Sequence, residues 1–201
     1  MAIVKELEKG FQQTEIGTIP SEWKIVPLGQ YAKFINGRAY ALYEWEAHGT
    51  PVIRLQNLTG SGDNYYYSNL KLPEKQYCNF GDLLFMWSAT FGPVIWKGER
   101  AIYHYHIWKV ETEQNHLDKW FLFHVLEDLT ARVKRDSTNG GTMLHVTKKN
   151  MQETLIPFPP IKAEQTAIAT VLNDADKLIT ELEKLIAKKR NIKQGAMQEL
   201  L

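Results

Sequence analysis

The stretch IPFPPIKAEQTAIATVLNDAD, residues 156–176, largely determines how this chain is organised. A short apolar strand signal runs into two prolines, and a helix signal follows with Glu164 and Gln165 in its expected first turn. Apolar residues then recur at helical spacing almost to the end of the sequence. The pattern predicts one helix over about residues 162–201, which would extend roughly 60 Å at 1.5 Å per residue.

The apolar residues of this helix follow a heptad pattern. Two series of positions spaced seven apart interleave at intervals of three and four, as a and d positions do in a coiled coil. We therefore expect the helix to project and to pair with a second helix, from a partner or from another copy. Lys189 and Glu199 interrupt the seam and favour antiparallel pairing, while a helix folded back on its own domain is the alternative. The predicted pairing residues are Ile168, Val171, Leu172, Ala175, Leu178, Ile179, Leu182, Leu185 and Ile192.

The residues before this helix carry signals for several short strands and one further helix. Residues 1–17 are polar and indicate a short helix or an arm, and Asn36-Gly37 is typical of a turn. Short apolar runs predict strands within residues 23–26, 50–58, 81–87, 92–98, 100–111 and 156–160. An amphipathic helix is expected at 117–134, and a helical turn capped by Thr147 follows it. We predict an α+β fold, with a mixed, β-rich globular domain at 1–160 followed by a long coiled-coil helix at 161–201.

Length and composition limit the class of protein. The 201 residues are 44% hydrophobic, which is enough for a packed core, and the net charge of +1 provides no global basic field. A single cysteine, Cys78, excludes a disulfide within the chain and fits a reducing compartment. No apolar run approaches the roughly 18 residues of a membrane span, and the N-terminal residues lack a signal-peptide core. We expect a soluble cytoplasmic protein with no membrane partner.

Four segments of the sequence stand out together: IGTIPSEWKIVPLGQ (16–30), GDLLFMWSATFG (81–92), GGTMLHVTKKNMQETLIPFPPIKAEQTAIATVLNDADKLI (140–179) and KKRNIKQGAMQELL (188–201). In this order and spacing they resemble one half of a type I restriction-modification specificity subunit. The resemblance covers nearly the whole chain, and its most specific parts are the proline-rich strand leading into Glu164-Gln165 and the C-terminal KQGAMQELL.

The resemblance implies a DNA specificity subunit without catalytic activity. Such subunits usually carry two target recognition domains, each followed by a long helix, and the two helices pack antiparallel as a spacer. Each domain reads one half of a split double-stranded DNA target, and the subunit recruits methylation subunits, which bind S-adenosylmethionine, and then restriction subunits. This chain holds one recognition domain and one helix, so it is either a natural half-subunit or a fragment of a longer chain. A half-subunit would pair with a second copy of itself and read an inverted repeat. No cofactor is expected.

Polar and basic side chains in the expected loops are suited to DNA. Arginine and lysine bind guanine and asparagine and glutamine bind adenine, while serine and threonine bind phosphates. The resemblance places the loop after GDLLF and the glycine loop before the last strand near DNA. The predicted DNA-binding residues are Asn36, Arg38, Tyr40, Arg54, Gln56, Asn57, Ser88, Thr90, His104, His106, Thr142, His145, Lys148 and Lys149.

Several of these residues have ordinary structural alternatives. Arg54 could be a strand-end charge, and Lys148 and Lys149 could be solvated lysines. The tyrosines at 65–67 could stack on sugars, but covering a loop is the favoured interpretation. The basic run at 188–190 is expected to be a solvated helix face.

His104 and His106 would share one face of the strand predicted at 100–111. Two histidines so placed can ligate zinc if a third ligand, such as His124 or His145, joins them. Trp108 would occupy the same face, and the spacing supplies no acidic partner. DNA contact or a hydrogen-bonded polar role is therefore favoured, and no metal site is predicted.

Other function classes lack their required residues. A self-contained methyltransferase needs a glycine-rich cofactor loop and an Asn/Asp-Pro-Pro-aromatic motif, whereas FPPI at 158–161 has no such Asn or Asp. The NGG at 139–141 does not lie between a strand and a helix. A nuclease needs paired carboxylates, and PVIWKGE supplies none. A coiled-coil adaptor without nucleic-acid function is the remaining alternative, and salt-dependent affinity for duplex DNA would separate the two.

Overall fold

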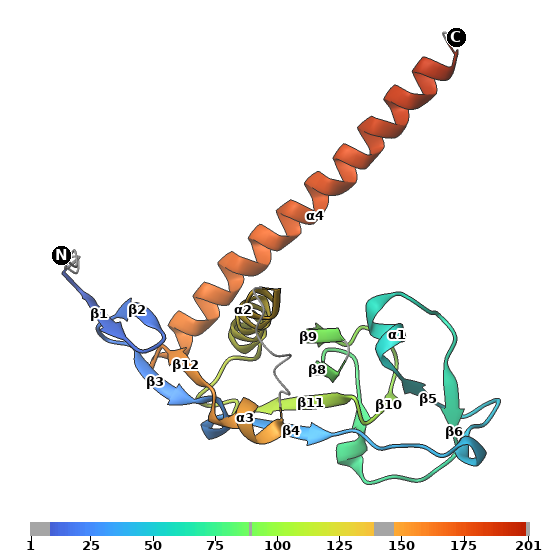
Figure 1. The fold of residues 1–201 in the computed structure, drawn as a ribbon, viewed down its shortest axis with the longest axis horizontal. Helices are drawn as coiled ribbons and strands as arrows, with labels where there is room; N and C mark the ends of the chain where they lie inside the picture. Colours follow the sequence, from blue (N-terminus) through green and yellow to red (C-terminus); the bar gives the residue numbers. More distant parts are fainter. Residues whose placement is uncertain (1–8, 89, 139–146, 200–201) are drawn as a thin grey trace.

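A β-rich body carries one long helix, α4 (Lys162–Glu199), that projects away from it (Figure 1). The computed structural model describes residues 9–88, 90–138 and 147–199. The predicted α+β fold and the long C-terminal helix are confirmed, with α4 beginning at the expected residue. None of the helices in the described part of the chain combines the length and the hydrophobicity that a membrane span requires.

The N-terminal part of the described chain is a hairpin of β1 (Phe11–Thr14) and β2 (Gly17–Pro20), paired antiparallel. The short helix considered for 1–17 is therefore wrong for the described residues, 9–17, which belong to this hairpin. The Gln12 side chain joins β1 to the end of β2 and the segment after it. Its amide nitrogen lies within hydrogen-bond distance of three backbone carbonyls there, the shortest distance being 2.8 Å to Trp23 O.

The main core lies between a four-stranded antiparallel sheet and α2 (Lys119–Thr138). Phe34, Phe85 and Trp108 come from neighbouring strands of this sheet and are almost fully buried against Leu122 of α2. The strands, in sheet order, are β4 (Ala32–Asn36), β11 (Ile107–Thr112), β8 (Leu83–Ser88) and β9 (Thr90–Ile95). The helix packs on β9 and also on the start of α4.

A second four-stranded sheet lies at the end of the body farthest from the β1–β2 hairpin (Figure 1). A second, smaller core lies around Ile53, Cys78 and Tyr103 of this sheet and includes Leu84 and Ile107 of the first sheet. Its order is β6 (Tyr66–Ser68), β5 (Thr50–Ile53), β10 (Ala101–Tyr103) and β7 (Tyr77–Cys78), with β10 parallel to β5. The short helices of the body are η1 (Leu28–Gln30), η2 (Leu42–Glu44), α1 (Leu55–Thr59), η3 (Glu74–Gln76) and α3 (Lys148–Glu153).

The predicted strand at 100–111 is in fact two strands, because the chain changes sheets at His104–His106. The His104 backbone N–H donates to Ile53 O at 2.9 Å, which continues the β5 pairing, and Ile107 N–H then turns back onto His104 O. β10 and β11 therefore lie in different sheets. The two histidines belong to the turn between them and not to one strand face.

The expected turn at Asn36-Gly37 is also wrong, and the glycine has another role. The chain continues past β4, and Arg38 forms an isolated bridge with His104. A Cβ atom at Gly37 would lie 2.2 Å from the His104 carbonyl oxygen. Glycine is therefore required for this close approach of two backbones.

The strand predicted at 50–58 stops at Ile53, and α1 follows. The Asn57 side chain accepts from the Arg54 backbone N–H at 2.9 Å, and Gly60 ends the helix in the left-handed region with φ of 71°. Local capping thus replaces strand pairing for the second half of this segment.

The junction between the body and α4 explains the proline-rich strand and the Glu-Gln pair. β12 (Leu155–Phe158) pairs antiparallel with β3 (Lys24–Pro27), and α4 starts four residues later. Gln165 is fully buried, and its amide donates to the carbonyls of His116 and Pro159 and accepts from the Asp118 N–H, all within 2.9 Å. One side chain therefore joins α4, the proline segment and the start of α2.

Candidate nucleic-acid interface

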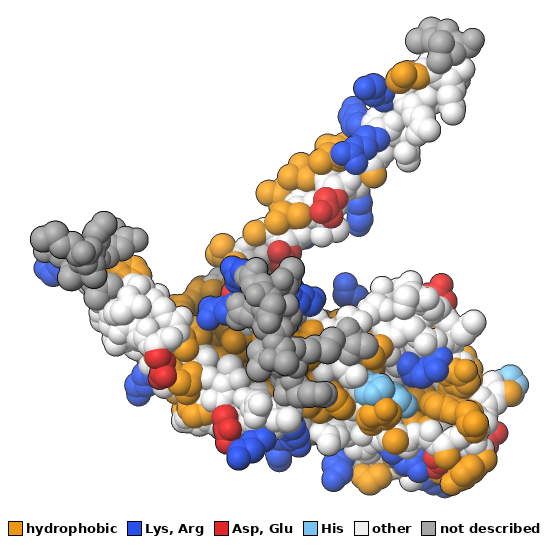
Figure 2. Space-filling model, in the orientation of Figure 1, with side chains coloured by type: hydrophobic (Ala, Val, Ile, Leu, Met, Phe, Trp, Pro, Cys, Tyr) orange, Lys and Arg blue, Asp and Glu red, His pale blue; other side chains and the backbone are white. Residues whose placement is uncertain are grey.

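Four segments of the second sheet and its loops bring arginine and aromatic side chains together. Their members form a chain of contacts: Tyr40 to His104 at 6.4 Å, Tyr40 to Trp45 at 5.1 Å and Trp45 to Tyr66 at 4.6 Å between ring centroids. We call this group the aromatic–arginine cluster; its members are Arg38, Tyr40, Trp45, Arg54, Tyr66 and His104. On the face shown in Figure 2, histidine side chains adjoin hydrophobic and basic side chains over the body.

The two arginines of the cluster have different partners. Arg38 donates to Glu44 at 2.5 Å, and this hydrogen bond raises the pKa of the guanidinium. Arg54 lies over the Tyr66 ring at 4.1 Å and has no carboxylate within 4.0 Å among the described residues. The charge of Arg38 is therefore compensated within the chain, whereas that of Arg54 is not.

The cluster also holds buried polar atoms that make no hydrogen bond. Arg38 Nη1, Tyr40 Oη and Arg54 Nε are the buried side-chain nitrogen and oxygen atoms without a partner in the described part of the chain. An unsatisfied buried polar group costs about 1–3 kcal/mol. An ordered water, an ion or a ligand can satisfy such atoms, and three of them lie in this cluster.

Two members of the cluster are uncharged at neutral pH, and burial shifts the pKa of each further from neutrality. Desolvation raises the pKa of Tyr40 to about 12, although the neighbouring Arg38 offsets part of this effect. Desolvation, with smaller contributions from His106 and Arg54, lowers the pKa of His104 to about 4. Both side chains therefore offer hydrogen bonds and apolar surface, but no charge.

The β10–β11 turn extends the cluster toward the β8–β9 hairpin. His106 lies 5.3 Å from His104 and 5.6 Å from Trp87, whose indole donates to Tyr105 O at 2.9 Å. The residue after Trp87 is Ser88, which pairs with Thr90 at the end of the hairpin. The predicted small-residue loop thus lies between paired strands, and its residue 89 is outside the described residues. Ser88 directly follows Trp87, which contacts the β10–β11 turn.

The structure thus brings together Arg38, Tyr40, Arg54, His104 and His106 of the predicted residues. It also adds Trp45, Tyr66, Trp87 and Tyr105, which the sequence predictions omitted. The available signal was the density of aromatic residues in AYALYEW, DNYYYS and IYHYHIW. The exposed ring of Tyr66 packs against the Arg54 guanidinium. Tyr66 therefore has a contact that the loop-covering role favoured for residues 65–67 did not include.

Other predicted residues lie apart from the cluster or have their polar groups engaged. The Asn57 amide accepts from Arg54 N–H and donates to two carbonyls of the following loop, so it shapes that loop. Gln56 lies on α1 beside Gly62, and Asn36 ends β4. Lys148 and Lys149 belong to α3, whose N-cap is Thr147 as predicted. Thr142 and His145 lie outside the described residues.

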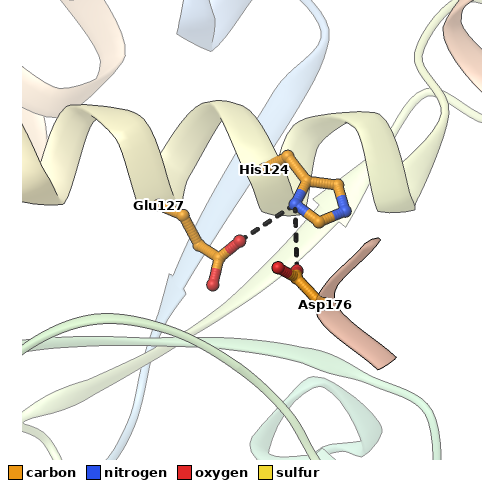
Figure 3. Close-up of side chains that lie close together, drawn as sticks. All are labelled: His124, Glu127 and Asp176. Atoms are coloured by element: carbon orange, nitrogen blue, oxygen red, sulfur yellow. Dashed lines mark hydrogen bonds and ion pairs between the residues drawn. The ribbon is translucent and has the colours of Figure 1, made fainter. Parts of the chain in front are cut away.

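The zinc site considered for His104 and His106 is not assembled in the described part of the chain. No group of three potential metal ligands there contains either residue. His124 lies elsewhere, on α2. Its Nδ1 is 2.9 Å from Glu127 and 4.0 Å from Asp176 of α4, as Figure 3 shows.

His124 therefore contributes to a contact between α2 and α4. Its Nε2 lies 3.0 Å from Asn173 Oδ1, so both ring nitrogens face polar atoms and two of the three partners belong to α4. Three ligand atoms of His124, Glu127 and Asp176 lie within 4.8 Å of one another. Both carboxylates are largely exposed, and a hydrogen bond between His124 and Glu127 accounts for the shortest of these contacts.

Beyond this contact, α4 is free of the body. Ile168 packs against the main core and Ala169 is buried, but every residue from Asp174 to Gln198 is exposed. The alternative of a helix folded back on its own domain is therefore wrong. The exposed large apolar side chains of the helix are Val171, Leu172, Leu178, Ile179, Leu182, Leu185, Ile186, Ile192 and Met197, and we call them the apolar stripe.

A known family matches almost the whole of this arrangement. The model of the type I restriction modification DNA specificity domain matches residues 20–194, from the end of β2 to near the end of α4. The chain belongs to the type I DNA specificity domain family. The resemblance inferred from the four segments is confirmed.

Curated relatives of this specificity domain are longer proteins. The chain is 29% identical to the type I restriction enzyme MjaVIII specificity subunit of Methanocaldococcus jannaschii over 96% of its own length and 45% of the relative's. It is 27% identical to the Escherichia coli EcoBI specificity subunit over 88% of its length and 36% of the relative's. The chain therefore spans less than half the length of these relatives.

Solved structures share the fold of this specificity domain. The HsdS subunit from Thermoanaerobacter tengcongensis has a TM-score of 0.67 at 19% identity, covering 87% of this chain and 42% of that one. The S subunit from M. genitalium has a TM-score of 0.56 at 14% identity, with 84% and 42% covered.

Proposed function

We propose that this chain supplies the sequence specificity of a type I restriction-modification complex and is not itself an enzyme. In this proposal residues 1–160 bind one half of a split target in double-stranded DNA, and residues 161–201 form the spacer and pairing helix. Action on cellular DNA implies a cytoplasmic protein. The observation that carries the proposal is the family match over residues 20–194.

Two copies of the chain would form the working unit by pairing their α4 helices. The apolar stripe supports this proposal, since an unpartnered row of large apolar side chains is typical of a protein interface. Pairing over this stripe would bury the seam that the heptad pattern predicts.

Charge distribution along α4 supports antiparallel pairing. Between Asp174 and Glu183 the charged residues of α4 are acidic apart from Lys177, and between Lys184 and Lys193 they are all basic. Figure 2 shows basic side chains gathered on the outer part of the helix. An antiparallel pair sets the acidic segment of one copy beside the basic segment of the other, whereas a parallel pair would set like charges together. The acidic segment holds Asp174, Asp176, Glu181 and Glu183, and the basic segment holds Lys184, Lys188, Lys189, Arg190 and Lys193; Lys162, Glu164 and Glu199 lie outside both.

Antiparallel pairing would fix the distance between two DNA-binding bodies. The 38 residues of α4 extend about 57 Å at 1.5 Å per residue. A two-fold pair would then read two inverted half-sites separated by a spacer that neither body contacts.

Methylation and restriction subunits are the proposed protein partners. The names of the relatives, which are specificity subunits of type I restriction enzymes, support this assignment. The exposed faces of α2 and α4 are the surfaces we propose for docking the methylation subunits, which would carry out base flipping and methyl transfer.

Methylation mapping tests the proposal. The chain would be co-expressed with its cognate methylation subunit, and methyladenine positions would be read across the host DNA. A two-part inverted-repeat motif is the expected result for two identical copies. An asymmetric motif would mean that a different recognition domain had replaced the second copy. Absence of both methylation and salt-dependent DNA binding would overturn the proposal in favour of a coiled-coil adaptor.

A further inference from the structure

Arg54 is held in place from two sides. It follows β5 directly, and its backbone N–H donates to Asn57 Oδ1 at 2.9 Å, which fixes the start of α1. Its guanidinium lies over the Tyr66 ring at 4.1 Å, and Trp45 packs on that ring at 4.6 Å. An arginine positioned by both its backbone and its ring contact loses little conformational freedom when it binds a ligand.

Three other arginines of the body have the carboxylate partners that Arg54 lacks. Arg38 pairs with Glu44 at 2.5 Å, Arg132 pairs with Asp128 at 2.5 Å, and Arg100 makes two bonds to Glu74 at 2.6 and 2.8 Å. The comparison with Arg100 is informative because it also stacks on a tyrosine, Tyr77, at 4.0 Å. Arg54 has the same stacked geometry, but an uncompensated charge and a buried Nε without a hydrogen-bond partner.

The neighbours of Arg54 favour a base over a phosphate. Its ring contact is Tyr66, and from that ring a chain of aromatic contacts continues through Trp45 and Tyr40 to the neutral imidazole of His104. The one other cation of the cluster, Arg38, is paired with Glu44. A phosphate site typically gathers several free cations or backbone N–H groups. A single fixed guanidinium among apolar and neutral polar groups instead suits a base edge.

We infer that Arg54, stacked on Tyr66, reads a guanine of the target half-site through the O6 and N7 acceptors in the major groove. This inference rests on the proposed DNA-binding function. The guanidinium presents the two parallel donors that this pair of acceptors requires, and no other base displays two acceptors at that edge. Each half of the methylation motif would therefore contain one G·C pair set by Arg54.

The experiment compares Arg54→Gln with Arg100→Gln in the full chain, co-expressed with the methylation subunit. Methylation motifs and affinities for a panel of duplexes varied at each G·C pair would be measured. Arg54→Gln is expected to relax one G·C position per half-site, reducing discrimination there by about 5- to 150-fold. Arg100→Gln, the matched control, is expected to leave the motif unchanged.

Three results would overturn the inference, and one would overturn the proposed function instead. An unchanged motif for Arg54→Gln, an equal loss of affinity for all sequences, or relaxation by Arg100→Gln would each remove the guanine assignment. Wild-type protein that neither binds DNA nor directs methylation would refute the DNA-binding function itself. Should Arg54→Gln fail to fold, Arg54→Met keeps an aliphatic stem of similar length but has no side-chain donor, and the same relaxation is expected.

Discussion

At the scale of single residues, the chain combines one fully satisfied buried side chain with a group of unsatisfied ones. Gln165 uses its amide for three hydrogen bonds that join separate elements. Arg38, Tyr40 and Arg54 each leave a buried polar atom without a partner. The hydrogen bonds of Gln165 stabilise the fold, whereas each unsatisfied atom of the cluster lowers its stability.

Replacing Gln165 with alanine should destabilise the protein strongly. The change leaves a backbone N–H and two carbonyls without partners at a fully buried position, which we expect to cost about 2–4 kcal/mol. Urea denaturation of Gln165→Ala would measure the loss. Gln198→Ala, at an exposed position of the same helix, is the control and should be nearly neutral. Equal stability of the two variants would contradict the role assigned to Gln165.

Burial of His104 should make stability depend on pH below neutrality. Its pKa is lowered to about 4 from an ordinary value near 6.5, so between these values the unfolded chain binds more protons than the folded one. The contribution of His104 to the free energy of unfolding should therefore fall as the pH is lowered from about 6.5 to 4. Below pH 4 this contribution should change no further. We expect a contribution of about 1 kcal/mol, since the partial exposure of His104 reduces the effect.

Unfolding free energies of wild type and His104→Asn at pH 4 to 7 would check this prediction. Carboxylates that titrate in the same pH range are present in both proteins. The difference between the two unfolding free energies therefore reports the contribution of His104 alone. A difference that does not vary with pH would refute the expected linkage.

At the scale of elements, α4 has two parts with different roles. Its first turns are integrated into the body through Gln165, Ala169 and the contact of His124 with Asn173 and Asp176. Its remaining turns expose the apolar stripe, and their charged residues are mainly acidic up to Glu183 and basic from Lys184 to Lys193. The first part sets the direction of the helix, and the second offers a surface for pairing.

Charged residues within the apolar stripe should prevent pairing. Leu178→Glu and Leu185→Glu would each place a carboxylate in the buried seam of the paired helices, and we expect dissociation constants to rise by at least tenfold. Light scattering coupled to size exclusion would report the mass. Ala187→Glu, which adds the same charge at an exposed position outside the two heptad series, should remain paired. An unchanged mass for both leucine variants would exclude pairing through this face.

At the scale of the whole molecule, the direction and length of α4 would determine how far apart the two bodies lie in the proposed pair. The body presents the aromatic–arginine cluster on the sheet of β5, β6, β7 and β10, while α4 projects from the opposite part of the body, beside β12 (Figure 1). In the proposed pair, the separation of the two bodies equals the length over which the helices overlap. The spacer of the DNA target should therefore depend on the length of α4.

A heptad inserted into α4 after Ile186 should lengthen the target spacer. Seven residues add about 10 Å of helix and preserve the seam. At about 3.4 Å per base pair, the methylation motif should gain about three base pairs between unchanged half-sites. Methylation mapping of the lengthened protein would measure this. A spacer of unchanged length would mean that α4 does not set the distance between half-sites.

Sequence by itself predicted the features that depend on local pattern. The 3.6-residue periodicity after residue 162, the Thr147 cap and the apolar run of β8 each determine their element from neighbouring residues, because helix and strand burial repeat at fixed intervals. The long helix and the family resemblance were therefore accessible before the fold was known.

Tertiary structure alone decided how the pieces of the candidate interface meet. The run 100–111 has strong strand propensity throughout, yet it breaks at His104 because Ile53 and Met86 belong to different sheets that pair with its two halves. The sequence Asn36-Gly37 predicted a turn, but glycine is required at 37 because the backbone there lies close to the His104 carbonyl. Arg54 stacks on a tyrosine 12 residues away, and no local period encodes such a contact. Non-local pairing determines these positions, and a linear pattern contains no information on which segments will pair.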